Sequence, residues 1–221
     1  MIDQTPLVAK LLGPDVFSEH LLEVVTDGFN DHVHSVRFAA TRCLKPLGEG
    51  LGAPWAAKTM VPKLQQLYEE GAGFLQRITV IYGSVFLAHG CKESPAADAC
   101  ADLVVRATKD PVPNVRFVGA RAAESLVAAV SKSTMEGKLK PALQALASDR
   151  DSDVKHFSRR ALENAAAGTA GSFSPSSVYA GANYRPGASL GGDGLLAGIR
   201  DGPQADGEGE DGVASGGGGG R

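Results

Sequence analysis

Apolar side chains recur along the first three quarters of the chain at the spacing of α-helix faces. After Val36 they continue at Ala40, Cys43, Leu44 and Leu47, which follow the positions i, i+4, i+7, i+8 and i+11. That spacing places them on one stripe of a helix. Similar stripes stand before and after four short polar segments. Each combination of stripe, segment and stripe predicts two helices joined by a tight turn.

The four polar segments align with one another. Their basic residues lie 40, 39 and 39 positions apart. A period near 40 is typical of HEAT-type helical repeats. The segments are Asp31-His-Val-His-Ser-Val-Arg37, Gly71-Ala-Gly-Phe-Leu-Gln-Arg77, Asp110-Pro-Val-Pro-Asn-Val-Arg116 and Asp149-Arg-Asp-Ser-Asp-Val-Lys155.

The period predicts an all-α fold, a HEAT-repeat α-solenoid over residues 1–165. Its repeats are expected at about 14–50, 53–90, 94–131 and 134–165. One helix pair buries too little on its own, so neighbouring units must stack. No Asn-Gly or Asp-Gly turn joins two alternating β-branched runs, which argues against a β-rich fold.

A lone apolar helix is expected before the first unit, from Pro6 to Leu12. It carries Leu7, Val8, Leu11 and Leu12 but has no partner helix to complete a unit. An uncovered apolar face marks an interface or an aggregation hazard. We therefore expect residues 1–12 to fray or to self-associate.

An acidic residue precedes three of the four basic residues by six positions. We expect Asp31, Asp110 and Asp149 to accept hydrogen bonds from the first turn of the following helix. The basic residue of one unit is further expected to reach the Asp of an adjacent unit, so that a ladder of ion pairs joins the units. Gly71 breaks this ladder in the second unit. The alternative is a solvated charge at each position, worth about 0–1 kcal/mol per pair.

The last quarter has a different composition, because 17 of the 28 glycines follow Ala167. Residues 166–221 contain too few large apolar side chains to offset the entropy of ordering, which predicts a disordered Gly-rich tail. Tyr179, Tyr184 and Leu195-Leu196 offer a short linear motif. The alternative is a flexible extension without a specific partner.

The net charge limits the classes of binding partner, and the cysteines indicate the cellular compartment. A net charge of −3 and a pI near 6.0 give no basic footprint for nucleic acid. No apolar run approaches the ~18 residues of a membrane-spanning helix. Cys43, Cys91 and Cys100 are an odd number, which favours reduced thiols in the cytosol, with the nucleus as an alternative.

No motif predicts a catalytic, cofactor-binding or metal-binding site. His32 and His34 flank Val33 without a third ligand nearby in sequence, and no Cys-x-x-Cys or His-Glu-x-x-His spacing occurs. Gly48-Glu-Gly-Leu-Gly52 follows no strand, so we interpret it as the break between two helices. Trp55 is expected in the core. The chain is therefore not expected to be an enzyme.

The repeats resemble a known family. Asp before the turn, Val-Arg after it, and Pro62 and Pro141 in the preceding helices look like the HEAT consensus. Three strings resemble the last two repeats of the scaffold (A) subunit of protein phosphatase 2A, and two resemble the repeats before them. The resemblance runs from about Leu7 to about Glu163. The five strings are Asp110 to Phe117, Leu139 to Leu146, Asp153 to Phe157, Asp31 to Arg37 and Trp55 to Lys63.

The resemblance implies a non-catalytic scaffold that holds the phosphatase catalytic subunit on the ridge of turns inside its repeats. The earlier repeats of the family, which hold the variable regulatory subunit, have no counterpart here, so that partner is expected to be lost. His34 and Phe74 stand where the family tends to carry tyrosine. Carried over, the partner-binding residues are His34, Phe74, Arg77, Val112, Asn114 and Arg116.

Three alternatives stay open at this point. In the first, Arg77 and Arg116 serve only the packing between repeats. In the second, the chain is a generic HEAT-repeat adaptor for transport or chromatin factors, which would share the period of 40 but not the ordered strings. In the third, it is a lyase-type HEAT enzyme or another enzyme, which would need a convergent polar pocket that the sequence does not indicate.

Overall fold

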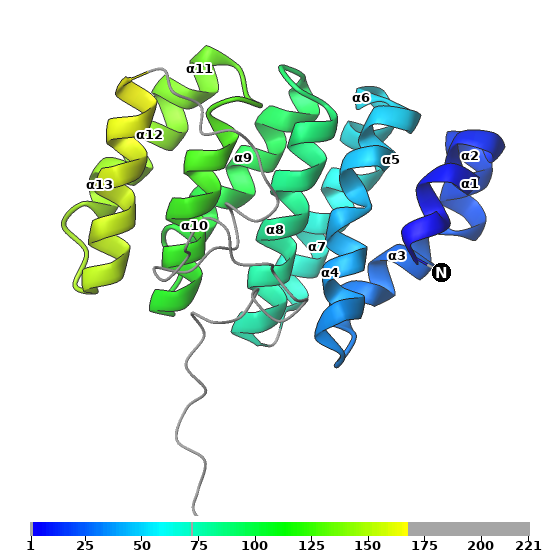
Figure 1. The fold of residues 1–221 in the computed structure, drawn as a ribbon, viewed down its shortest axis with the longest axis horizontal. Coiled ribbons are helices and arrows are strands. Elements are labelled where there is room, and N and C mark those ends of the chain that lie inside the picture. The colour runs from blue at the N-terminus through cyan, green and yellow to red at the C-terminus, as the bar shows by residue number, and fades with distance from the viewer. Residues whose placement is uncertain (1, 72, 168–221) are drawn as a thin grey trace, which may run out of the picture.

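The computed structural model describes residues 2–71 and 73–167, and these are helical with no strand among them. Successive helix pairs stack side by side, as Figure 1 shows. The predicted all-α solenoid is thereby confirmed. Disorder was predicted for residues 166–221. Of these, residues 168–221 lie outside the described residues.

The N-terminal end begins with a 3-10 turn, Ile2–Gln4, and a lone helix, α1 (Thr5–Leu12). In the first pair, both helices are interrupted. The first runs through α2 (Pro14–His20), α3 (Leu22–Asp27) and the 3-10 turn Gly28–Asn30. The second runs through α4 (His34–Arg42) and α5 (Leu44–Leu51).

Three further pairs follow. The second pair is α6 (Ala53–Trp55), a π-helical segment (Ala56–Met60) and α7 (Val61–Glu70), then α8 (Phe74–Gly90). The third is α9 (Pro95–Ala107) and α10 (Pro113–Leu126). The fourth is α11 (Lys132–Thr134), a π-helical segment (Met135–Leu139) and α12 (Lys140–Leu146), then α13 (Ser152–Ala166).

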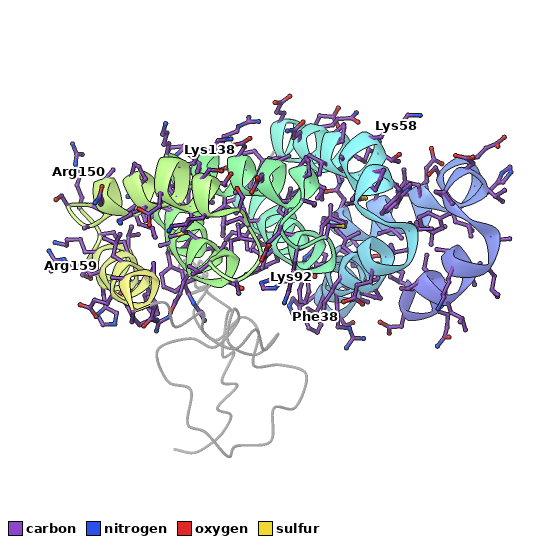
Figure 2. The ribbon with its side chains drawn as sticks, turned by 90° about the horizontal axis from the view of Figure 1, so that it is seen from above. Phe38, Lys58, Lys92, Lys138, Arg150 and Arg159 are labelled. Carbon is purple, nitrogen blue, oxygen red and sulfur yellow. The ribbon has the colours of Figure 1, made fainter. Side chains whose placement is uncertain are left out.

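The helices form two layers, which Figure 2 shows from above. The first helices of the pairs make one layer and the second helices make the other. Helix α8 contacts α7 and α9 in the opposite layer, α4 and α5 of the unit before, and α10 of the unit after. Each inner unit is thus covered by its neighbours, as in other linear repeat arrays.

Two prolines explain the π-helical segments. Pro62 and Pro141 stand inside the first helices of the second and fourth units, each shortly after a π-helical segment. Proline lacks the backbone N–H and its ring crowds the carbonyl four residues earlier, so a wider local turn relieves the clash. The first helix of the third unit carries its proline at position 95, where the helix begins, and α9 is a single uninterrupted helix.

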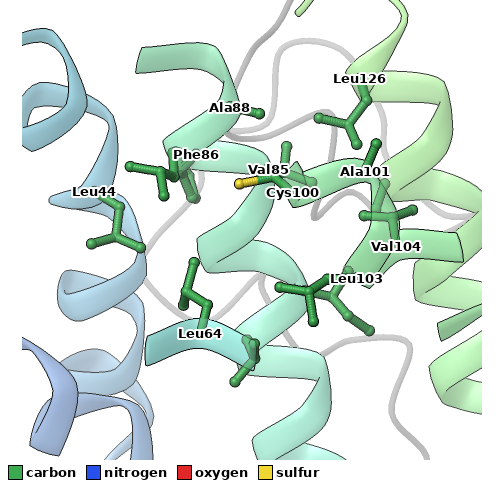
Figure 3. Packing of buried hydrophobic residues seen from close by; sticks show 14 of the residues in the cluster. Leu44, Leu64, Val85, Phe86, Ala88, Cys100, Ala101, Leu103, Val104 and Leu126 are labelled. Atoms are coloured by element: carbon green, nitrogen blue, oxygen red, sulfur yellow. The ribbon is translucent and has the colours of Figure 1, made fainter. Parts of the chain in front are cut away.

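The core runs continuously through the described units. Its members include Leu44, Leu64, Leu103 and Leu126, each at most 1% exposed, and Figure 3 shows them between the layers. Burying one such side chain contributes about 1.5–3 kcal/mol. Trp55 also belongs to this core, as predicted, with its ring edge against Phe17 at 5.9 Å between centroids and Nε1 donating to the Ser18 hydroxyl.

The interpretation of Gly48 to Gly52 as a helix break is wrong for most of that string. Helix α5 continues through Leu51, and the chain breaks only at Gly52, where φ is +88°. Gly48 is a packing position, because a Cβ there would lie 2.9 Å from Cys91 Sγ. Of the three glycines in this string, only Gly52 has the positive φ that favours glycine.

Candidate functional site

The turns inside the four pairs lie along one edge of the solenoid. We call this edge the turn ridge and define it as residues 31–37, 73–77, 111–116 and 152–155. It includes the first turns of the second helices, because those helices begin at or next to these turns. In Figure 1 the turns occupy the lower edge of the stack.

Aspartates shape three of the turns. The Oδ1 of Asp31 accepts from the Val33 N–H at 2.7 Å. Asp110 and Asp149 accept in the same way from the N–H two residues on, at 2.9 Å each. This is an Asx turn, in which the side chain fixes its own loop.

The prediction that Asp31, Asp110 and Asp149 cap the helix that follows them is therefore wrong. Helices α4 and α10 follow Val33 and Val112 and have no side-chain cap. Helix α13 is capped by Asp151, whose Oδ1 accepts from the Asp153 and Val154 N–H groups. An Asx turn satisfies the N–H two residues later, which in these loops still lies before the helix begins.

The predicted ladder between units is present twice. Arg77 donates to both carboxylate oxygens of Asp110, from Nε at 2.8 Å and from Nη2 at 3.1 Å. Arg116 donates to both oxygens of Asp149, at 2.7 Å and 2.8 Å. Two parallel N–H···O bonds fix both distance and orientation. The ladder hypothesis is confirmed between the second, third and fourth units.

Gly71 leaves the first rung without its carboxylate, as predicted. Arg37 turns instead to its own loop, where Nη1 donates to the Asp31 carbonyl at 2.7 Å and the His32 carbonyl at 3.0 Å. Arg77 and Arg116 also donate to carbonyls of their own loops, those of Gly71 and Asp110. Each of the three arginines is therefore hydrogen-bonded to its own turn. Arg77 and Arg116 also form an ion pair with the turn of the next unit.

The ion pairs are largely removed from water. The side chains of Arg116 and Asp149 are 16% and 9% exposed, and those of Arg77 and Asp110 are 17% and 5% exposed. Hydrogen bonds from Arg116 lower the pKa of the Asp149 carboxyl. Burial opposes the same effect at Asp110, but the bonds from Arg77 prevail and its pKa is also lowered. Both rungs are ionised at neutral pH.

All six predicted partner-binding residues lie on the turn ridge. His34, Phe74, Val112 and Asn114 are half-buried, so part of each side chain reaches the surface. Arg77 and Arg116 are committed to the ladder and expose little of their side chains. The packing role of these two arginines is therefore established, whereas contact with a partner stays a prediction for all six.

Sequence reasoning missed two exposed apolar side chains on the ridge. Val33 is 43% exposed and Leu75 is 39% exposed. The other large apolar side chains with comparable exposure among the described residues all lie between Leu7 and Val24. A signal was present for Val33, which lies in a turn, where polar side chains are usual. Leu75 lies in the first turn of α8.

A shallow cleft opens on the ridge between the third and fourth turns. Its volume is about 650 Å³. Two prolines and the Arg116–Asp149 pair line it, together with charged and polar residues of the fourth turn. The lining residues are Pro111, Pro113, Arg116, Ser148, Asp149, Arg150 and Asp151.

The three cysteine thiols are buried, which disfavours both nucleophilic attack and metal binding. Cys43, Cys91 and Cys100 are at most 5% exposed, the first and last being structural thiols as expected. Burial raises the pKa of Cys43 to about 12 and that of Cys91 to about 11, and it raises the pKa of Cys100 as well. A protonated thiol is a poor nucleophile and a poor metal ligand.

Two absences concern the described part of the chain alone. It contains no group of three or more His, Cys, Asp or Glu side chains arranged to hold a metal ion. None of its helices combines the length and the apolar character needed to cross a bilayer.

Comparison with known proteins gives a partial match. No protein-family model matches the chain. Over 58 residues the chain is 40% identical to the serine/threonine-protein phosphatase PP2A 65 kDa regulatory subunit of Drosophila melanogaster. The match covers 26% of this chain and 10% of that relative, so it spans about a tenth of the relative's length. The chain is thus similar in part to a phosphatase regulatory subunit.

Proposed function

We propose that this chain is a non-catalytic scaffold that docks the catalytic subunit of protein phosphatase 2A on the turn ridge. The observation that carries the proposal is the ridge itself, a row of four turns of which the last three are joined by ion pairs between units. The partial similarity to the PP2A 65 kDa regulatory subunit supports the choice of partner.

The ladder contributes to binding by making the turn ridge rigid. The bidentate pairs Arg77–Asp110 and Arg116–Asp149 fix neighbouring turns at a set spacing before any partner arrives. A preorganised surface loses less conformational entropy on association. The ridge can therefore present its side chains to a folded partner without first being ordered.

Apolar side chains on the ridge provide the direct contacts with the partner. Val33 and Leu75 are exposed on the first and second turns of the ridge, and Phe74 and Val112, on its second and third turns, are half-buried. A few well-packed side chains usually dominate the free energy of an interface. We assign that role to these four, with His34 and Asn114 as polar neighbours.

The experiment is a binding titration of the purified chain with purified catalytic subunit. The variants Val33→Asp and Leu75→Glu are expected to raise Kd by roughly tenfold or more each, equivalent to about 1.4 kcal/mol or more. Val16→Asp is the matched control, because Val16 is 41% exposed but lies on α2, away from the ridge. It should leave Kd unchanged.

Two results would overturn the proposal. One is a parent chain that does not bind the catalytic subunit, which would favour the generic adaptor. The other is an effect of Val16→Asp as large as that of Val33→Asp. Any phosphatase activity of the preparation should disappear when the catalytic subunit is removed.

A further inference from the structure

Arg37 stands in the first unit at the position from which Arg77 and Arg116 form the two ion pairs of the ladder. In those two pairs the guanidinium group has two tasks. Its Nη1 donates to the arginine's own loop, while Nε and Nη2 donate to the aspartate of the next unit. Arg37 carries out only the first of these tasks.

The loop of the first turn holds Arg37 in the same way as the third turn holds Arg116. Arg37 Nη1 donates to the carbonyls six and five residues before it, at 2.7 Å and 3.0 Å. Arg116 Nη1 donates to the carbonyls at the same two offsets, at 2.9 Å and 3.1 Å. Because the guanidinium group is planar and rigid, this shared attachment directs the Nε and Nη2 edge of Arg37 toward the second turn.

The second turn offers no carboxylate to that edge. Gly71 stands where the third and fourth turns have an aspartate. Glu70, the residue before it, accepts from the Gln66 amide on α7 at 2.8 Å. Within residues 2–71 and 73–167, Nε and Nη2 of Arg37 form no hydrogen bond or ion pair. Arg37 is half-buried, so this edge can be reached by an acceptor of a partner.

Two exposed apolar side chains lie on the turns on either side of this edge. Val33 is 43% exposed on the first turn, and its carbonyl accepts from the Arg37 N–H at 3.2 Å. Leu75 is 39% exposed in the first turn of α8, which packs against α4 (Figure 1). A partner that covers both side chains therefore also covers Arg37.

Covering Arg37 takes charged donors away from water. A buried charged donor without an acceptor costs free energy, so a well-fitting partner has to supply the acceptor. A carboxylate matches the two parallel donors of an arginine edge. The ladder shows this match twice, with N–H···O distances between 2.7 Å and 3.1 Å.

We propose that the Nε and Nη2 edge of Arg37 binds an aspartate or glutamate side chain of the docked protein, which completes the first ion pair of the ladder from outside. This inference rests on the proposed function, in which the docked protein is the phosphatase catalytic subunit. Arg37 then contributes to specificity, because a partner with a neutral or basic residue at this point leaves the guanidinium buried without its pair.

The variant Gly71→Asp tests the proposal by offering Arg37 a carboxylate from its own chain. The backbone at Gly71 has a φ of −60°, which aspartate adopts readily, and an added Cβ would have its nearest neighbours at 3.2 Å. The internal carboxylate competes with that of the partner. In a titration with purified catalytic subunit, Gly71→Asp should therefore raise Kd roughly tenfold. If completing the ladder served only to stiffen the ridge, the same variant would lower Kd, and that result would overturn the inference.

Arg37→Gln provides the matched background. This variant should itself raise Kd roughly tenfold, and adding Gly71→Asp to it should change Kd no further, because no arginine edge remains to be occupied. Thermal unfolding checks the internal pair: Gly71→Asp should act on Tm more favourably with Arg37 present than in the Arg37→Gln background, by about 2–4 °C. Arg37→Lys keeps the charge without the paired donors and should raise Kd several-fold.

The results separate this inference from the proposed function. A parent chain that does not bind the catalytic subunit would overturn both. A parent chain that binds, with Kd unchanged by Arg37→Gln and Gly71→Asp alike, would overturn the inference alone. An equal rise in Kd from Gly71→Asp in both backgrounds would also overturn it, because the new carboxylate would then act without Arg37.

Discussion

At the scale of single residues, the rungs of the ladder are the features with the clearest energetic consequence. Asp149 does two things at once, because it closes its own loop and accepts both bonds from Arg116. The same holds for Asp110, which also accepts from the Tyr68 hydroxyl at 3.3 Å. Changes at these residues therefore affect the junction between two units.

We predict that Asp149→Asn lowers the free energy of unfolding by about 1.5–3 kcal/mol at pH 7, the typical value of hydrogen bonds to charged groups. The amide oxygen can keep the loop closed, so the loss reports the ion pair. Asp153→Asn is the control, since Asp153 is exposed on the same turn. Urea unfolding measures both. Equal losses in the two variants would contradict the prediction.

The Asp149→Asn difference should depend on pH. The folded pKa of Asp149 lies below its ordinary value of 3.8, so the ion pair stabilises the fold above that pH. The contribution disappears as pH falls through the lowered pKa. Unfolding curves of parent and variant are expected to converge in strong acid, and a constant difference down to about pH 2 would contradict this origin.

His89 should give a second pH dependence in a separate window. Burial lowers its pKa from 6.5 to about 4, so the folded chain resists protonation that the unfolded chain accepts. Stability is therefore expected to fall between pH 6.5 and about 4, by up to about 3 kcal/mol. His89→Gln removes the titration but can still bond Ser125. If its stability changes with pH in this window as the parent's does, the assignment is wrong.

At the scale of elements, the close contact of α8 with the unit before it depends on glycine. A Cβ on Gly90 would lie 2.3 Å from the Lys45 carbonyl oxygen, and one on Gly83 would lie 2.6 Å from the Phe29 ring. These approaches join α8 to the unit before it. A larger residue at either position must push two helices apart.

We predict that Gly90→Ala destabilises the chain by about 1–3 kcal/mol, because its new methyl group meets backbone that has no room to move. Gly50→Ala is the matched control, a helical glycine of α5 with nothing within 4 Å of the added Cβ. It should stabilise by about 0.5–1 kcal/mol. Thermal unfolding of both variants decides, and an unchanged stability of Gly90→Ala would contradict the close approach of α8 to α5.

At the scale of the whole molecule, the two described ends differ. At the N-terminal end Leu7 is 61% exposed and Leu11 is 79% exposed on α1. On α13, at the other end, the exposed residues include Asp153, Arg159 and Glu163. Terminal units of an array need polar outer faces to stay soluble.

We therefore predict that the chain associates with a second copy through α1 at high concentration. The double variant Leu7→Glu and Leu11→Lys should reduce this association without loss of stability, since both side chains already face water. Sedimentation velocity over a range of concentrations measures it, with Leu75→Glu as a control on the ridge. Equal association of parent and double variant would rule out this face.

What the sequence determined by itself is the repeat. A period of 40, 39 and 39 positions and apolar stripes at helical spacing were enough to predict the stacked helix pairs, since both follow from local periodicity. The ladder was also predictable, because a fixed period brings Arg77 to Asp110 and Arg116 to Asp149 by the same displacement. The break at Gly71 followed from the missing carboxylate.

Only the tertiary structure decided which surfaces these elements present. Whether an aspartate caps a helix or closes a loop depends on where the helix begins, and Asp31 and Val33 settle that by geometry. The exposure of Leu75 and the burial of Phe86 likewise depend on how tightly neighbouring units approach. A one-dimensional pattern specifies which side chains share a face, but the packing of the next unit determines whether that face meets water.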